Sequence, residues 1–168
     1  MHYLLDTNTA ITAKNEFYAF DIAPSFWIQL KEKLENADCA LIDAVEGELL
    51  DGNDELAAWI RSLEKESHEQ FILKAKSDSR VLECYKQIAE MVYNEPKFKD
   101  RYKQFFLSKA DPWIIAAAKA WGDTVVTFEK MPGPNSTKVK IPDICKRMGV
   151  ACISLYEMMR KVGIVLNH

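Results

Sequence analysis

The chain has 168 residues, of which 48% are hydrophobic and 28% are charged, and its net charge is −3. This length fits one domain with a proper hydrophobic core, and the composition excludes a disordered tail. The negative charge argues against a protein that coats nucleic acid generally. No stretch approaches the ~20 apolar residues that span a bilayer, and the N-terminal sequence lacks the features of a secretory signal.

The four cysteines lack the paired short spacing of a zinc site. Three of them sit among apolar residues, so we expect buried free thiols at Cys39, Cys145 and Cys152. Free thiols indicate a reducing, cytoplasmic location. The three histidines are scattered along the chain, which gives no indication of histidine-based catalysis.

Short apolar strands alternate with helices, a pattern typical of an α/β protein with a parallel sheet. Strands are predicted at 2–6, 39–42, 70–73, 124–128 and 150–153. One helix is predicted to begin at Pro24, a short one to include Glu48 and end at Asp51-Gly52, and another to begin at Asn53 or Asp54. Further helices are predicted at 79–93, 97–108, 112–121, 141–148 and after Ser154. Residues 131–140 are predicted to form a surface loop. We find no internal repeat and no long linker, so one domain is expected.

Acidic residues stand where separate strands end or separate helices begin. Asp6 ends the first strand, Glu129 follows the strand at 124–128, and Asp111 opens the helix that feeds that strand. Ligands of an open parallel sheet bind beyond the carboxyl ends of the strands, where the strand order reverses. Glu48 lies about one turn into the helix after the second strand and can reach the same edge. The four carboxylates are therefore predicted to converge.

Carboxylates that share one small site repel each other, so such a cluster is stable mainly when a cation neutralises it. Hard oxygen ligands suit Mg²⁺ or Mn²⁺ and are poorly suited to zinc. Such a site hydrolyses phosphodiester bonds through water that one or two metals activate. We expect Asn8 and Thr127 to orient the carboxylates or this water.

Four segments, in this order, resemble the motifs of the PIN-domain nucleases: Tyr3-Leu4-Leu5-Asp6-Thr7-Asn8, Glu48-Leu49-Leu50-Asp51-Gly52, Asp111-Pro112-Trp113-Ile114-Ile115-Ala116-Ala117-Ala118 and Val125-Val126-Thr127-Phe128-Glu129. Each motif alone is weak, but the ordered set covers essentially the whole chain. The likeness is closest to uncharacterised bacterial and archaeal members related to VapC-type toxins, which residues 18–22 and 140–145 also fit. It implies a three-layer α/β/α sandwich with a central parallel sheet. Residues 1–168 would then form a single PIN-like domain, with a helical insertion around 79–108.

The resemblance further implies an endoribonuclease that depends on Mg²⁺ or Mn²⁺. For toxin members it implies an antitoxin partner, and it makes a homodimer plausible. The first three acids of the family fall on Asp6, Glu48 and Asp111. The usual fourth acid is an aspartate, where this chain has Glu129, so either Glu129 or Asp143 is expected to complete the metal site.

Each acid also has a simpler structural explanation. The segment Asp6-Thr7-Asn8 fits a turn after a strand, and Asp111 fits a helix N-cap. Glu129 fits a solvated loop. Glu46 competes with Glu48 as the acid of its helix, but the pattern Glu-Leu-x-x-Gly favours Glu48. The four acids together are harder to explain in these ways than any one of them.

Basic and aromatic side chains alternate over residues 97–109. They could hold an RNA backbone while the aromatic rings stack on bases. An amphipathic helix with its aromatic side chains in the core is the favoured interpretation. Basic side chains closer to the expected cleft are better candidates for RNA phosphate contact, chiefly Lys130, Lys138 and Lys140.

Two other functions remain open. A catalytically decayed module that binds RNA or protein fits the departure at Glu129. A phosphatase of the haloacid-dehalogenase type also begins with a strand that ends in aspartate. Its chemistry needs a second aspartate two residues later, where this chain has Asn8.

Overall fold

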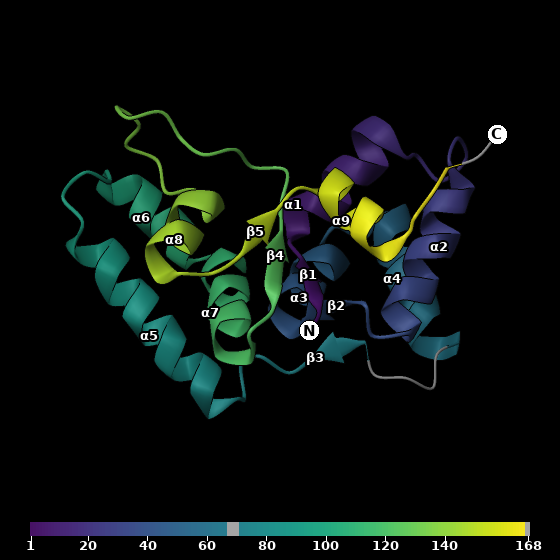
Figure 1. Ribbon diagram of the computed structural model, residues 1–168, viewed down its shortest axis with the longest axis horizontal. Coiled ribbons are helices and arrows are strands. Elements are labelled where there is room, and N and C mark those ends of the chain that lie inside the picture. The colour runs from purple at the N-terminus through teal and green to yellow at the C-terminus, as the bar shows by residue number, and fades with distance from the viewer. Residues whose placement is uncertain (67–70, 167–168) are drawn as a thin grey trace.

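The computed structural model describes residues 1–66 and 71–166, and its centre is a parallel β-sheet between layers of helices (Figure 1). The strands are β1 (Tyr3–Leu5), β2 (Cys39–Ile42), β3 (Ile72–Leu73), β4 (Thr124–Val126) and β5 (Cys152–Ile153). Their order is β3-β2-β1-β4-β5, and all neighbours are parallel. The predicted three-layer α/β/α class is confirmed. Residue 70, predicted as the start of the third strand, lies outside the described residues.

The helices flank this sheet on both sides. They are α1 (Thr7–Thr12), the π-helix η1 (Ala13–Phe17), α2 (Pro24–Glu35), α3 (Asp43–Asp51), α4 (Glu55–Glu66), α5 (Ser79–Asn94), α6 (Asp100–Leu107), α7 (Asp111–Trp121), α8 (Ile141–Met148) and α9 (Leu155–Val162). In Figure 1, α5, α6, α7 and α8 lie on one side of the sheet, and α2, α4 and α9 lie on the other. None of the helices described is both long enough and apolar enough to cross a membrane.

The central strands consist mostly of apolar residues, as expected where helices cover both faces of a sheet. Every residue of β2 and of β4 is buried. Helix α7 carries a buried run from Ile114 to Ala118 and packs against α5 and β4. Gly122 ends α7 with a φ of +71°, a left-handed conformation that glycine adopts without strain. The chain can therefore turn directly from α7 into β4.

The segment after β1 differs from the predicted turn. Asp6 caps a helix there, and its Oδ1 accepts a 2.6 Å hydrogen bond from the N–H of Thr9. This helix, α1, continues into the π-helix η1. Thr7, Asn8 and Thr9 are weak helix formers, so their sequence gave little sign of a helix. The contact of the Thr9 hydroxyl with the Val126 carbonyl, at 3.2 Å, holds the new helix on β4.

Strand order reverses beside β1, which lies between β2 and β4. The two neighbouring strand ends are joined by the Asp6 N–H, which donates to the Val126 carbonyl at 3.2 Å. This is the edge at which open parallel sheets bind their ligands.

Candidate metal and nucleic-acid site

Asp6 is fixed and desolvated at the end of β1. Its side chain accepts hydrogen bonds from the Thr9 N–H at 2.6 Å and from the Thr127 hydroxyl at 2.8 Å, and the residue is 2% exposed. Burial raises the pKa of Asp6 to about 6, and the charge of Glu129 adds to this effect, while both hydrogen bonds oppose it. The anionic form of Asp6 therefore lacks a compensating positive charge.

Asp111 is the first residue of α7, and its side chain does not cap the helix. The N-cap is Ala110, so the predicted capping role of Asp111 is wrong. Burial and, after it, the charges of Glu129, Asp6 and Glu48 together raise the pKa of Asp111 to about 7. These contributions show that the carboxylates lie close enough to repel one another, although they come from four separate segments.

Glu48 reaches the same region from α3. Its Oε1 accepts a 2.5 Å hydrogen bond from the N–H of Ala110, the residue before Asp111. Glu46 instead lies beside Glu64, where burial and then the hydrogen bond with Glu64 raise its pKa to about 7. The structure thus places Glu48, and not Glu46, next to Asp111.

Glu129 lies just beyond β4 and takes part in two hydrogen bonds and one ion pair. Its N–H donates to the Thr127 hydroxyl at 3.1 Å, and its Oε2 accepts from the Ile141 N–H at 2.8 Å. The Lys140 Nζ lies 3.9 Å from its Oε1. A glutamate at this position can therefore reach the start of α8.

Asp143, the alternative fourth acid, takes part in a different set of contacts. Its Oδ1 accepts a 3.2 Å hydrogen bond from the Nε of Arg147, one turn further along α8. The geometry therefore associates Glu129, rather than Asp143, with the other acids.

The chemistry of this donor set fits a hard cation, because all four side chains offer carboxylate oxygens. Within residues 1–66 and 71–166, however, no three Asp, Glu, His or Cys side chains stand ready as metal ligands. Three of the acids hydrogen-bond to protein donors instead: Asp6, Glu48 and Glu129. A carboxylate oxygen that accepts one hydrogen bond keeps a second lone pair. The acids would therefore have to move closer together to share a metal, and Asp6 can keep its bond to Thr127.

A pocket of about 390 Å³ opens beside the acids. One part of its lining consists of the acids Asp111 and Glu129 and the amide of Asn8. The rest of its lining comes mainly from α6 and the 131–140 loop, through Arg101, Tyr102, Phe105, Phe106, Lys138 and Lys140. One cavity therefore combines carboxylates, cationic side chains and aromatic rings.

The predicted RNA-binding lysines fall in two places. Lys138 and Lys140 line this pocket, close to Asp111 and Glu129. Lys130 lines a neighbouring cavity that also includes Glu129. Glu129 thus separates Lys130 from the other two lysines.

The aromatic side chains near α6 divide into two groups. Phe98 and Phe106 are buried, as the interpretation of an amphipathic helix predicts. Tyr102 and Phe105 line the pocket together with Phe106 but are less buried than it is, and Phe105 is 62% exposed. The sequence suggested base stacking as one interpretation of the aromatic side chains in 97–109 but favoured the core interpretation, so these two rings were not assigned to the site. The available signal was the four-residue spacing of Arg101 and Phe105, which places a cation and a ring on one helix face.

Comparisons with known proteins add two findings. The profile of a family described as a domain of unknown function (DUF4411) matches residues 3–166. A chain in the crystal structure of VapBC2 from Rickettsia felis bound to a DNA fragment from their promoter is similar in structure, with a TM-score of 0.55 and 17% identity. The match covers 92% of this chain and 98% of that chain, and it shows a PIN-like fold. A search of curated proteins finds no match.

Proposed function

We propose that this chain, which belongs to the DUF4411 family of domains of unknown function, is a metal-dependent endoribonuclease. The observation that carries the proposal is the convergence of acids around Asp111, whose pKa is raised to about 7 by burial and by three other carboxylates. A set of desolvated carboxylates that repel one another is the arrangement that a divalent cation stabilises.

The proposed cofactor is Mg²⁺ or Mn²⁺, held by Asp6, Glu48 and Asp111, with Glu129 as the fourth acid. Such an ion, when bound, activates water and neutralises charge on the phosphate. Thr127 orients Asp6 through its 2.8 Å hydrogen bond. Asn8 is exposed and lines the pocket, so its amide can hydrogen-bond to the attacking water or to the phosphate.

The proposed substrate is RNA, and the position of the lysines supports this choice. Lys138 and Lys140 line the same pocket as Asp111 and Glu129. Cations beside a carboxylate site favour a polyanion whose phosphate is presented to the metal. Lys130, in the adjoining cavity, extends the positive charge along the path of a bound strand.

The proposed biological role is the toxin of a toxin–antitoxin pair, with an antitoxin protein as partner. The PIN-like fold that the chain shares with a VapBC2 structure supports this role. Induced expression of the chain should arrest bacterial growth, and Asp6→Asn should relieve the arrest. Growth arrest by both proteins alike would contradict a toxicity based on cleavage. A homodimer is proposed as well, and light scattering of the purified chain would measure its mass.

A cleavage assay tests the enzymatic proposal. Purified protein is incubated with labelled RNA and Mn²⁺, and Asp6→Asn and Asp111→Asn are compared with the wild type. Both variants should lose cleavage and keep the fold. Asp143→Asn is the matched control, because Asp143 pairs with Arg147 and is expected to leave cleavage intact. Undiminished cleavage by Asp6→Asn would overturn the proposal.

One observation favours a second candidate, a catalytically inactive binding module. Glu129 already contacts the Ile141 N–H and Lys140, and no three potential ligands among the described residues are arranged for a metal. Calorimetric titration with Mn²⁺ separates the two functions. A nuclease shows a saturable site that Asp111→Asn removes, whereas an inactive module shows none.

A further inference from the structure

We propose that Tyr102 and Phe105 form a stacking site for an unpaired RNA base, next to the acids that would hold the metal at the RNA phosphate. This inference rests on the proposed function and adds to it the substrate class, single-stranded RNA. Both rings line the pocket that also contains Asp111 and Glu129. A strand whose phosphate lies at the acids can therefore place a neighbouring base against α6.

The exposure of Phe105 is the first observation that supports this site. The residue is 62% exposed, although it lies in the lining of a pocket rather than on a convex surface. An exposed ring in a pocket leaves an apolar face open to a ligand, and covering that face with a base would be favourable. Tyr102 is half-buried in the same pocket, so the two rings offer a partly formed platform.

Three cationic side chains lie near the two rings, which indicates a negatively charged ligand. The guanidinium of Arg101 lies 4.7 Å from the centre of the Tyr102 ring, and the Nζ of Lys138 lies 5.9 Å from it. The Nζ of Lys109 lies 5.1 Å from the Phe105 ring. Proteins that bind single strands combine aromatic platforms with cations in this way, because rings take the bases and cations take the phosphates.

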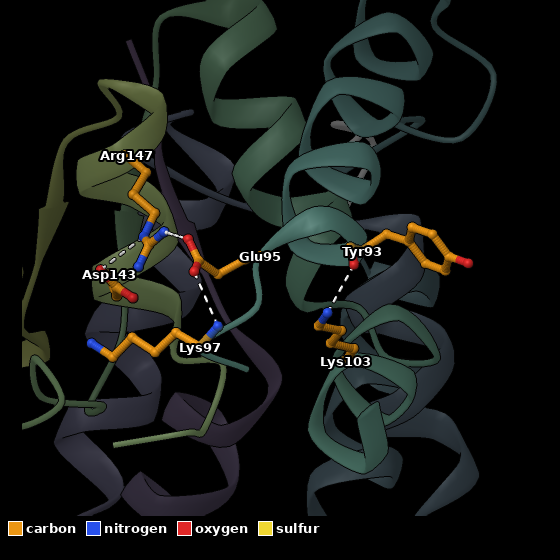
Figure 2. A network of polar contacts seen from close by, with 6 residues as sticks. All are labelled: Tyr93, Glu95, Lys97, Lys103, Asp143 and Arg147. Carbon is orange, nitrogen blue, oxygen red and sulfur yellow. Dashed lines mark hydrogen bonds and ion pairs between the residues drawn. The ribbon is translucent and has the colours of Figure 1, made fainter. Parts of the chain in front are cut away.

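Ion pairs connect the segment before α6 to α8 (Figure 2). Arg147 of α8 donates to Glu95 at 2.7 Å and to Asp143 at 3.2 Å. Glu95 also accepts a 3.1 Å hydrogen bond from the Lys97 N–H. The Arg147 guanidinium lies 5.1 Å from the centre of the Phe98 ring. The chain that leads into α6 is thus fixed against a neighbouring helix.

Two further hydrogen bonds fix α6 itself. The Lys103 Nζ donates to the Tyr93 carbonyl at 2.8 Å, which ties α6 to the end of α5 (Figure 2). The Lys99 N–H donates to the Thr137 carbonyl at 3.2 Å, which ties the start of α6 to the loop that carries Lys138. A platform held in place before binding loses little conformational freedom when a base stacks on it.

The stacking site selects unpaired bases. In a duplex each base is stacked on its neighbours and paired, so neither face is free for a protein ring. A single strand, or the loop of a folded RNA, offers such a face. The pocket of about 390 Å³ falls within the range of sites that enclose small organic groups.

Fluorescence anisotropy of a short labelled RNA tests this site in the Asp6→Asn protein with Mn²⁺ present, and a gel confirms that the RNA stays intact. Phe105→Ala should weaken binding of the single strand about 5- to 150-fold, the range expected for one stacked base. Tyr102→Leu should bind weakly because the ring is lost, and Tyr102→Phe, which keeps the ring, should bind more tightly than Tyr102→Leu. Tyr93→Ala is the matched control, because Tyr93 is 73% exposed and lines a different cavity.

Three comparisons complete the design. An oligonucleotide of the same length without bases should bind weakly to the parent and should show no further loss with Phe105→Ala. A duplex of the same sequence should bind more weakly than the single strand. The inference is overturned if Phe105→Ala binds the single strand as tightly as its parent, if the duplex or the abasic strand binds equally well, or if no RNA binds. Absence of Mn²⁺-dependent cleavage by the wild type would instead count against the proposed function alone, because binding is measured independently of cleavage.

Discussion

The Thr127 hydroxyl donates a 2.8 Å hydrogen bond to Oδ2 of Asp6, from the end of β4 to the end of β1. The same hydroxyl oxygen accepts the N–H of Glu129 at 3.1 Å. One buried side chain therefore positions two of the four acids. Thr127 can contact Asp6 because β1 and β4 are neighbours in the sheet, although they are far apart in the sequence.

Thr127→Val should reduce RNA cleavage and destabilise the fold. The substitution keeps the shape of the side chain but leaves the buried Asp6 carboxyl without one donor, at a cost of about 1.5–3 kcal/mol when Asp6 is ionised. Urea unfolding above pH 7 measures the loss of stability. Thr127→Ser keeps the hydroxyl and should retain most of the cleavage. Equal cleavage by the valine and serine variants would contradict the orienting role of Thr127.

Asp111→Asn should stabilise the protein when no divalent metal is present. Burial and three neighbouring carboxylates raise the pKa of Asp111 from 3.8 to about 7, so ionisation of Asp111 above pH 7 opposes folding by up to roughly 4 kcal/mol. The neutral amide removes this cost. Thermal unfolding at pH 8 with a chelator should therefore show a higher midpoint for the variant.

Addition of Mn²⁺ should narrow this difference between the variant and the wild type. The wild type should gain about 2.7 kcal/mol at a free Mn²⁺ concentration 100 times the dissociation constant, and Asp111→Asn should gain much less. Asp143→Asn should respond to Mn²⁺ as the wild type does. A wild type whose unfolding midpoint does not depend on Mn²⁺ would contradict the proposed metal site.

Glu46→Gln should change how stability depends on pH. Burial and the adjacent Glu64 raise the pKa of Glu46 from 4.5 to about 7 in the folded protein. Between these two values the folded state binds more protons than the unfolded state, so stability falls as the pH rises. The variant should lose this slope and become relatively more stable above pH 7. Urea unfolding at pH 5 and pH 8 gives the pH dependence of stability for the wild type and for Glu46→Gln. Equal pH dependence in the two proteins would refute the raised pKa of Glu46.

Arg147→Met should weaken RNA binding without affecting the metal site. Arg147 contacts Glu95 and Asp143, and Asp143 Oδ2 is already buried without a hydrogen-bond partner. Loss of the guanidinium should therefore cost about 1–3 kcal/mol of stability and loosen the segment that leads into α6. Anisotropy with single-stranded RNA measures the binding. Stabilisation by Mn²⁺ should remain unchanged, and a variant that lost it would show that Arg147 acts on the acids.

Several elements could be predicted from sequence because local signals define their ends. The strand Cys39–Ile42 and the helix Ile141–Met148 have the predicted bounds. The helix has proline in its first turn, and Gly149 ends it with a φ of +69°. Helix α1 was not predicted, since its residues favour a helix weakly and tertiary contacts such as Thr9 with Val126 hold it in place. The insertion around 79–108 stays a prediction.

The candidate site was predictable only in part. The rule for parallel sheets places Asp6 and Glu129 at one edge, and the sequence pattern around Glu48 distinguished it from Glu46. The role of α6 in the pocket depends on its contact with the distant loop, where the Lys99 N–H donates to the Thr137 carbonyl. A backbone hydrogen bond of this kind has no residue pattern. The sequence therefore placed Arg101 and Phe105 on one helix face but could not indicate that this face lies toward the acids.

The hydrogen bond from the Ile141 N–H to Glu129 has a consequence for the evolution of the family. It holds residues 129 and 141 together, so the segment between them forms a surface loop whose tip lies around Gly133. Changes in the length of a surface loop are tolerated at its tip when its two ends are fixed. Residues can therefore be gained or lost at this tip without displacing Glu129 from its contact with Ile141.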